Sequence, residues 1–262
     1  MRITVLAENT SCRGLPAEHG LSLYIETEKH NILFDAGQSG LFAENAERLG
    51  VDLKSVGIAV ISHGHYDHGG GLDTFLKIND TAPVYLHKHA FEPHYNGAEK
   101  YIGLDTSLEN NARLIITEGT TEISDGLTLF DCNDKEKLTD LGSFGLNMIK
   151  NGKMQPDDFR HEHYLMIKEQ GKKVLISGCS HKGILNIADW FCPDVLVGGF
   201  HFSKLPLDGT LTGYAKRLDS YPTVYYTCHC TGVEQFEHMK KSMKNLHYIS
   251  TGDTIEIDTK TP

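Results

Sequence analysis

The sequence predicts an α/β layered sandwich, in which two β-sheets pack against each other and helices cover their outer faces. The first observation is a series of short, apolar, β-branched segments, typical of strands, spread along the 262 residues. The second is that segments with helical spacing follow several of these strands. The third is that the two halves of the chain, about 1–120 and 121–262, share one order of elements, with strands first and strand–loop–helix units after them.

The first half is predicted to begin with three strands and to continue with strand–loop–helix units. Residues 27–30 form a polar turn between the second and third strands, and Gly50 ends the first helix. Residues 56–61 are an almost continuous apolar run, which is typical of a strand buried on both faces. The strands are expected at residues 2–6, 21–26, 31–34, 56–61 and 83–86, and the helices at residues 41–49 and 72–78.

An irregular excursion over one face is expected near residues 87–118, which carry Pro93, Gly97 and Gly103 among polar side chains. The strand and helix patterns return after this segment. The later strands are expected at residues 127–130, 164–168, 174–176, 195–197, 223–227 and 245–249, and the helices at 184–191, 212–218 and 234–244.

Composition and charge narrow the class of protein. Hydrophobic residues make up 39% and charged residues 23% of the chain, so a folded globular protein is expected. Acidic residues outnumber basic ones 35 to 25, and the formal net charge of −10 disfavours nucleic acid and anionic membranes as partners. No apolar run approaches the roughly 18 residues of a spanning helix, and the start does not resemble a signal peptide. We expect a cytoplasmic protein whose six cysteines are free thiols or metal ligands.

The strongest local signal is His63-x-His65-x-Asp67-His68, which directly follows the predicted strand at residues 56–61. Imidazole and carboxylate groups are ligands of Zn²⁺ and similar divalent ions. In an extended loop His63 and His65 point to one side, while Asp67 and His68 reach a second centre. The motif therefore predicts one or two divalent ions, with zinc expected first and iron, manganese, nickel or magnesium as alternatives.

Ligand-type side chains also follow three later strands, and each place repeats the layout of an apolar strand, small residues and a ligand. These side chains are Cys179 and His181 after residues 174–176, His201 after residues 195–197, and Cys228, His229 and Cys230 after residues 223–227. The ends of strands in α/β sheets form a binding crevice, so these side chains are expected to complete the metal site.

These motifs resemble the metallo-β-lactamase superfamily. The resemblance rests on His63-x-His65-x-Asp67-His68 after an apolar strand, and on Asp35 within the phrase Phe-Asp-Ala-Gly about thirty residues earlier. It implies a four-layer αββα sandwich, formed as a single domain over residues 1–262 from two αβ halves, with the metal ions at the sheet edge. Four more phrases are similar to the branch typified by the dihydropterin-methyl-ribofuranosylaminobenzene-phosphate synthase of methanopterin assembly. They lie at residues 17–22, 178–181, 198–201 and 229–232.

The resemblance implies a role for each residue of the metal loop. His63 and His65 match the ligands of the first metal, and Asp67 and His68 match ligands of the second. His229 matches the last ligand of the superfamily, which also binds the second metal.

The middle of the pattern departs from most hydrolases of the superfamily, which place a histidine at the start of one strand and a bridging aspartate at the end of the next. Here Cys179 occupies the aspartate position, where it would be a soft ligand of the second metal. His181 is favoured as the missing ligand of the first metal, with His161 or His163 as the alternative. If nothing bridges the two ions, an enzyme with a single metal is the alternative.

Other residues near the predicted site have expected roles. Asp35 is expected to orient the metal loop, and Asp67 to orient or deprotonate the attacking water in addition to binding metal. His201 is a candidate for catalysis or substrate binding, Glu162 for acid–base catalysis and His19 for substrate contact. Three basic residues are interpreted as a solvated face in preference to a phosphate-binding edge: Lys150, Lys153 and Arg160.

We expect a metal-dependent hydrolase acting on a small anionic or phosphorylated molecule, because a metal ion lowers the pKa of bound water from 15.7 to about 7. The resemblance implies a transferase as an alternative, condensing a pterin diphosphate with an aminobenzene ribosyl phosphate. A metal-binding redox protein is a third hypothesis, favoured by Cys179, Cys228 and Cys230 but disfavoured because no flavin-carrying extension follows His229. A small molecule is the expected partner, and a homo-oligomer is compatible with the sequence.

Overall fold

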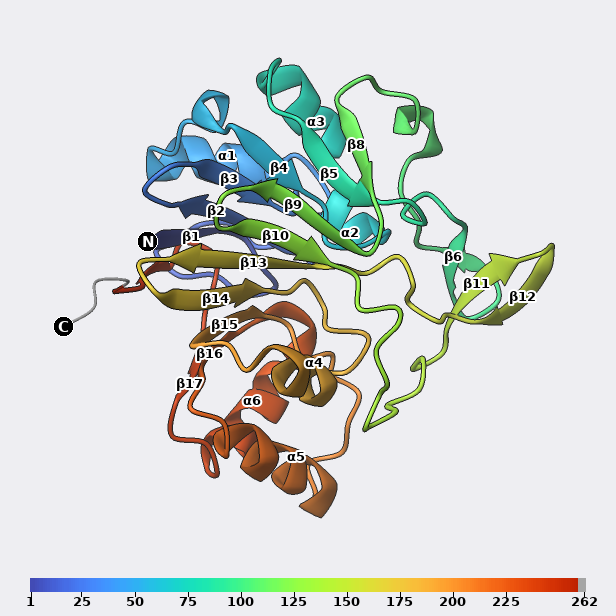
Figure 1. Cartoon of the computed structure of the whole chain (residues 1–262), viewed down its shortest axis with the longest axis vertical. Helices are drawn as coiled ribbons and strands as arrows, with labels where there is room; N and C mark the ends of the chain where they lie inside the picture. Colours follow the sequence, from blue (N-terminus) through green and yellow to red (C-terminus); the bar gives the residue numbers. More distant parts are fainter. Residues whose placement is uncertain (259–262) are drawn as a thin grey trace.

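The computed structural model describes residues 1–258 of the chain. Two seven-stranded sheets pack face to face, and helices cover the outer face of each sheet (Figure 1). This is the αββα sandwich that the sequence predicts. The apolar layer between the sheets includes Phe34, Val60, Leu165 and Ile176, which are at most 1% exposed. Among the described residues, none of the helices has both the length and the apolar character needed to cross a bilayer.

The first sheet has the strand order β18-β1-β2-β3-β4-β5-β8. β1, β2 and β3 pair antiparallel, whereas β3, β4, β5 and β8 run parallel to one another. The strands are β1 (Arg2–Ala7), β2 (Ser22–Glu26), β3 (Asn31–Phe34), β4 (Ile58–Val60), β5 (Val84–His87), β8 (Leu114–Thr117) and β18 (Thr254–Glu256). The strand β18 comes from the end of the described chain and pairs with β1, so the first sheet takes one strand from the second half.

The second sheet has the order β17-β16-β15-β14-β13-β10-β9, and its strands β14 to β17 are parallel. The strands are β9 (Thr120–Ser124), β10 (Leu127–Phe130), β13 (Tyr164–Glu169), β14 (Lys172–Ile176), β15 (Val195–Gly198), β16 (Val224–Thr227) and β17 (Leu246–Tyr248). The parallel strands of both sheets direct their carboxyl ends to one edge, where the loops that follow them meet.

The helices bury apolar side chains against the outer faces of the sheets. Phe42 of α1 and Phe75 of α3 belong to the core over the first sheet, while Leu211 of α5 and Met239 of α6 belong to the core over the second. The helices are α1 (Leu41–Leu49), α2 (Tyr66–Gly69), α3 (Leu72–Ile78), α4 (Ile184–Phe191), α5 (Gly209–Asp219) and α6 (Val233–Lys240). Three short 3₁₀ turns are η1 (Leu53–Ser55), η2 (Thr106–Leu108) and η3 (His229–Thr231).

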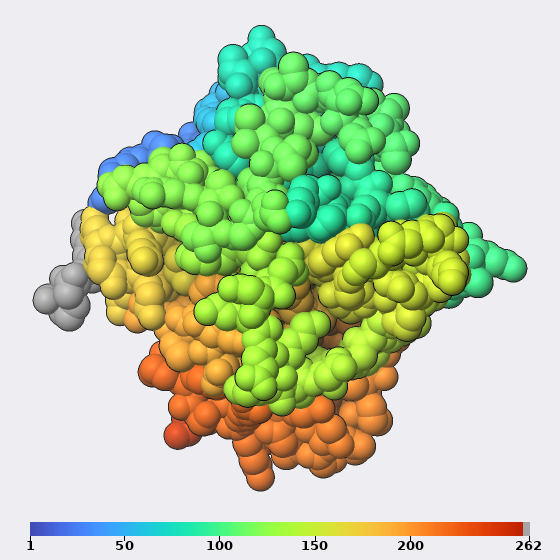
Figure 2. All heavy atoms as spheres, turned by 45° about the vertical axis from the view of Figure 1, so that its right-hand side comes forward, coloured from blue at the N-terminus to red at the C-terminus, as the bar shows by residue number. Residues whose placement is uncertain are grey.

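The segment near residues 87–118 is largely irregular, as expected, but two of its short pieces join a third, four-stranded sheet of order β12-β11-β6-β7. Its strands are β6 (His94–Asn96), β7 (Lys100–Tyr101), β11 (Leu146–Lys150) and β12 (Lys153–Pro156). β6 pairs with β11, so that His94 lies opposite Met148. Pairing between such distant segments leaves no local signal in the sequence, and the third sheet was therefore not predicted. In Figure 2 the yellow-green atoms of this region lie between the green and the orange parts of the molecule.

Candidate metal centre

The loops after the parallel strands bring the predicted ligands to one edge of the sandwich. The metal loop follows β4 and leads into α2, whereas Cys179 follows β14, His201 follows β15 and His229 follows β16. Four residues in these loops have left-handed backbone angles, namely Asp35 (φ 60°), Ser180 (φ 59°), His201 (φ 55°) and His229 (φ 51°). Such angles cost non-glycine residues of order 1 kcal/mol or more and cluster at functional sites.

One set of ligand atoms converges around Asp67, the residue expected at the second metal. His68 Nε2 lies 3.1 Å from Cys179 Sγ and 3.2 Å from His229 Nε2, and Asp67 Oδ2 lies 3.3 Å from His229 Nε2. Bonds of about 2.0–2.3 Å to one tetrahedral ion place neighbouring ligands roughly 3.3–3.7 Å apart, close to these separations. The donor set of two imidazoles, one thiol and one carboxylate therefore fits a divalent ion such as Zn²⁺.

Hydrogen bonds orient the two histidines of this set. His68 Nδ1–H donates to Asp35 Oδ2 (2.7 Å), and His229 Nδ1–H donates to Asn9 Oδ1 (2.7 Å). Each bond occupies Nδ1 and leaves the Nε2 lone pair for an ion. Asp35 also accepts from the backbone and hydroxyl of Ser62, so it orients the metal loop as the sequence predicts.

The carboxylates make this position favourable for a cation. Burial alone would raise the pKa of Asp67, but His68, His19 and His229 surround the carboxylate and hold its pKa well below the usual range. Burial would likewise lower the pKa of His68, but Asp35 and Asp67 outweigh it and raise that pKa to about 9. The negative charge of the Asp35 and Asp67 carboxylates therefore favours a positive charge beside them, carried either by a proton on His68 or by a metal ion.

A second set of ligand atoms forms around His63. His63 Nε2 lies 3.3 Å from His181 Nε2, while His63 Nδ1 lies 2.8 Å from Ser62 Oγ. The ring of His65 lies 4.6 Å from the ring of His63 and 5.0 Å from that of His181, measured between centroids. The fold thus brings the imidazoles of His63 and His181 together, with Cys179 within 4.8 Å of both and the ring of His65 beside them.

Cys179 lies between the two sets. Its Sγ is within 4.8 Å of ligand atoms in three groups: His63 with His181, His68 with His229, and His201 with Cys230. Burial raises the pKa of this thiol, so it would be protonated in the absence of a cation. Its central place is the one that a ligand bridging two metal ions would need.

The two alternatives to His181 are held elsewhere. His161 Nδ1 accepts a hydrogen bond from the backbone N–H of Gly64 (2.8 Å). His163 donates from Nε2 to the carbonyl of Ile61 (2.8 Å) and contacts Thr117 through Nδ1. Both are buried and neither belongs to the groups around Cys179, so His161 supports the metal loop and His163 supports the strand before it.

Glu162 is fully buried and does not line the cavity of about 300 Å³ that opens beside the metal loop. Its predicted acid–base role therefore does not fit this geometry. Its carboxylate accepts from the backbone N–H groups of His181 (2.7 Å) and Lys182 (3.0 Å) and from the hydroxyl of Tyr164 (2.6 Å). With its lone pairs occupied in this way, Glu162 fixes the backbone that carries His181.

We therefore expect Glu162→Gln to weaken metal binding at the His63–His181 position by about tenfold or more, because partners that orient metal ligands contribute 10–100-fold to affinity. The acidic limb of the pH–rate profile should keep its midpoint. Chelator competition measures the affinity, and the exposed Glu237→Gln on α6 is the matched control. If Glu162→Gln instead loses the acidic limb of the pH–rate profile and keeps its metal affinity, Glu162 acts in acid–base catalysis.

A cavity of about 300 Å³ opens beside these ligands, and most of its lining residues come from the metal loop, the third sheet and the loops after β15 and β16. Its walls include Tyr66, Asn96, Lys100, Ile102, Leu146, Ser203 and Lys204 besides His65, Asp67, Cys179, His181, His201 and His229. A larger hollow of about 770 Å³ around Lys88, Asp131 and Arg160 contains none of the proposed ligands, so the smaller cavity is the candidate site.

His19 and His201, the residues predicted to contact substrate, both line this cavity. His19 Nε2 lies 3.2 Å from Asp67 Oδ2, and the side chain of His19 remains 54% exposed. The hydrogen bond to Asp67 outweighs burial and raises the pKa of His19. His201 lies between His181 and Phe144, with ring centroids 4.3 and 5.1 Å away.

The basic residues of the cavity are not those considered in the sequence. Lys150 pairs with Asp158 (3.0 Å) and Arg160 pairs with Glu92 (2.6 Å), and neither basic side chain lines this cavity. Lys100 and Lys204 line it instead. Sequence reasoning missed both lysines, because nothing in their local sequence marks a ligand and only the fold brings them to the metal residues.

Comparisons with known proteins show the family of the chain. The family model of the metallo-beta-lactamase superfamily matches residues 15–223. An uncharacterized protein of Methanocaldococcus jannaschii is 31% identical over 97% of this chain and 100% of its own. The 7,8-dihydropterin-6-methyl-4-(beta-D-ribofuranosyl)-aminobenzene-5'-phosphate synthase of that organism is 26% identical, over 94% of each chain.

A solved structure is similar over nearly the whole molecule. The crystal structure of Tm1679, a metal-dependent hydrolase of the beta-lactamase superfamily, is 32% identical with a TM-score of 0.84, covering 98% of this chain and 99% of that chain. Together with the family model and the converging ligands, this likeness shows that the chain belongs to the metallo-β-lactamase superfamily, whose fold binds divalent metal ions.

Proposed function

We propose that the chain is a metal-dependent hydrolase that cleaves an ester, lactone or phosphodiester bond in a small anionic molecule. The observation that carries the proposal is the cavity of about 300 Å³ in which Lys100 and Lys204 face the same space as the ligand histidines. This volume is at the lower end for small-molecule sites, which suits a compact substrate better than a polymer.

His63 and His181, with the ring of His65 beside them, would hold one ion. Asp67, His68 and His229 would hold the other, and Cys179 lies within reach of both positions. Imidazole and thiolate ligands favour zinc. An ion held there supplies a water of lowered pKa and polarises the bond under attack. The chain's own residues then have to orient the substrate and remove the proton that the water loses.

Asp67 and His19 form the route for that proton. The Asp67 carboxylate lines the cavity and lies 3.2 Å from His19 Nε2, and the half-exposed imidazole of His19 connects it with solvent. A proton taken up at Asp67 Oδ2 can therefore pass to His19 and leave the site. His201, on the other side of the ligands, is placed to contact the substrate.

Lys100 and Lys204 bind the charge of the substrate. The ammonium of Lys100 lies 5.5 Å from the centre of the Tyr66 ring, and Lys204 Nζ donates to the carbonyl of Phe144 (2.8 Å). Each ammonium has three donors, so both retain donors for a phosphate or carboxylate. Ile102 and Leu146 provide an apolar wall for the rest of the molecule.

A transferase is the second candidate, favoured by the relative that is 26% identical over 94% of both chains. The same metal ligands and lysines would neutralise a diphosphate leaving group, and an aryl amine would take the place of water.

Turnover assays on phosphodiesters, lactones and carboxylic esters are expected to show metal-dependent hydrolysis that a chelator abolishes. Lys100→Ala and Lys204→Ala should each raise KM for the anionic substrate by about tenfold, equivalent to roughly 1.4 kcal/mol, with a smaller effect on kcat. The exposed Lys241→Ala is the control. Turnover confined to a pterin diphosphate with an aryl amine would replace the hydrolase by the transferase.

A further inference from the structure

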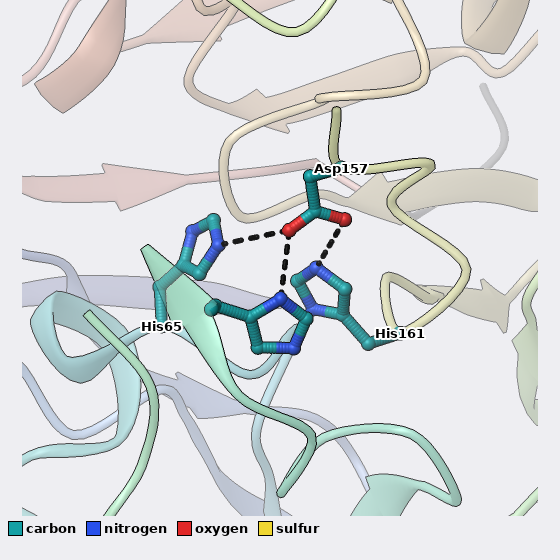
Figure 3. Close-up of side chains that lie close together, drawn as sticks. His65, Asp157 and His161 are labelled. Carbon is teal, nitrogen blue, oxygen red and sulfur yellow. Dashed lines mark hydrogen bonds and ion pairs between the residues drawn. The ribbon is translucent and has the colours of Figure 1, made fainter. Parts of the chain in front are cut away.

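A cluster of four buried side chains lies behind the metal ligands. His65, His94, Asp157 and His161 are at most 5% exposed, and their ligand atoms lie within 4.8 Å of one another. His94 Nδ1 is 2.7 Å from Asp157 Oδ2, His161 Nε2 is 3.5 Å from Asp157 Oδ1, and His65 Nε2 is 3.9 Å from Asp157 Oδ2. Figure 3 shows the rings of His65 and His161 directed at the Asp157 carboxylate.

The members of this cluster come from separate parts of the fold. His65 belongs to the metal loop, His94 begins β6 and Asp157 directly follows β12. β6 and β12 both pair with β11 in the third sheet, so that sheet presents Asp157 and His94 together. The same sheet also supplies Asn96, Lys100 and Leu146 to the wall of the cavity.

The hydrogen bonds assign the protons within the cluster. His161 Nδ1 accepts from the backbone N–H of Gly64, so the proton of a neutral His161 lies on Nε2, facing Asp157. His94 donates from Nδ1 to Asp157, and the backbone N–H of Phe159 donates to Asp157 Oδ1 (2.8 Å). Asp157 thus accepts hydrogen bonds from His94 and Phe159, while His161 Nε2 and His65 Nε2 face its carboxylate at 3.5 and 3.9 Å without a hydrogen bond.

This pattern argues against a metal ion within the cluster. A bound ion would need the lone pair of His161 Nε2, which would force the proton onto Nδ1, against the N–H of Gly64. The 2.7 Å separation of His94 and Asp157 is likewise that of a charge-assisted hydrogen bond.

For His65, the surroundings of its two ring nitrogens indicate which of them carries the proton. Its Nε2 is buried, has no hydrogen-bond partner and faces Asp157. Its ring lines the cavity, and the ring centroids of His63 and His181 are 4.6 and 5.0 Å away. A negative charge at 3.9 Å stabilises a proton on Nε2 and repels a lone pair there. A neutral imidazole with its proton on Nε2 has its lone pair on Nδ1.

We propose that Asp157, held by His94 and the backbone N–H of Phe159, is a positioning residue that keeps the proton of His65 on Nε2 and so directs Nδ1 to the first metal. The third sheet, besides lining the cavity, thereby supports a metal ligand. This inference rests on the metal site and is independent of the bond that the enzyme cleaves.

The test uses the zinc-loaded full-length protein. In the parent, ¹⁵N NMR of the histidine side chains is expected to show His65 protonated at Nε2. Asp157→Asn should lose this signature and weaken zinc at the first position by about 10–100-fold in chelator competition. Zinc at the Asp67–His68–His229 position should be unchanged.

Two variants of His94 keep the proposal falsifiable if Asp157→Asn does not fold. His94→Asn retains a donor close to Nδ1 and should keep nearly parental affinity, whereas His94→Leu should show the same loss as Asp157→Asn. Equal affinities in His94→Asn and His94→Leu would overturn the proposal. So would an unaltered His65 signal in Asp157→Asn, or the loss of a third equivalent of zinc from His94→Leu, since the cluster would then itself be a metal site.

Discussion

Replacement of both His63 and His65 by alanine is expected to abolish metal binding at the first position and to lower turnover by at least about a thousandfold. Of the described side chains placed there, His181 and the shared thiol of Cys179 then remain, and two donors are too few to retain the ion. A thousandfold loss corresponds to roughly 4 kcal/mol, which is within the several kcal/mol that a catalytic metal contributes to the transition state. Elemental analysis and steady-state kinetics measure the two effects.

The control for this double variant is His247→Ala, which removes an exposed histidine from β17. It should leave metal content and turnover unchanged. If the His63→Ala/His65→Ala protein instead retains the metal content of the parent, these residues are not ligands and the proposed centre is wrong.

Cys179→Ala is expected to have the second large effect, because the thiol lies within reach of both ligand sets. We expect the loss of at least one equivalent of metal and a fall in turnover of about a hundredfold or more, equivalent to roughly 2.7 kcal/mol. Cys179→Asp should recover metal content, since a carboxylate also binds divalent ions and can bridge two of them. The thiolate charge-transfer band of the Co²⁺-substituted parent should be absent from both variants.

Cys192→Ser is the matched control, because Cys192 is an exposed free cysteine on the outer side of the second sheet, at the end of α4. It should preserve both the band and the metal content. A Co²⁺-substituted parent without a thiolate band would show that Cys179 is outside the coordination sphere, and the protein would then bind its ions through imidazole and carboxylate alone.

Much of the fold and the proposed metal ligands could be predicted from the sequence because their signals are local. The apolar runs that became β3, β4, β14, β15 and β16 have patterns that burial imposes on neighbouring residues. The ligands His63 to His68 lie within six residues of one loop, so their spacing is itself the signal. The later ligands could be proposed because each directly follows such a strand.

The third sheet could not be predicted in this way. It joins His94 with Met148 and carries Asp157 to the metal loop, and these contacts depend on pairing between segments about fifty residues apart. Lys100 and Lys204 reach one cavity for the same reason, since the walls come from both halves of the chain. The pattern of residues within a short segment does not indicate which distant strand that segment will pair with.

The sequence by itself determined the superfamily, the layered architecture and the residue types available to a divalent ion. Only the tertiary structure decided what each of these residues does. His161, Glu162 and His163 are neighbours in the chain, yet one meets the cluster around Asp157, one holds the backbone of His181 and one bonds to the strand before the metal loop. These three residues lie in the turn that leads into β13, so their side chains point to different sides and their partners depend on the packing around that turn.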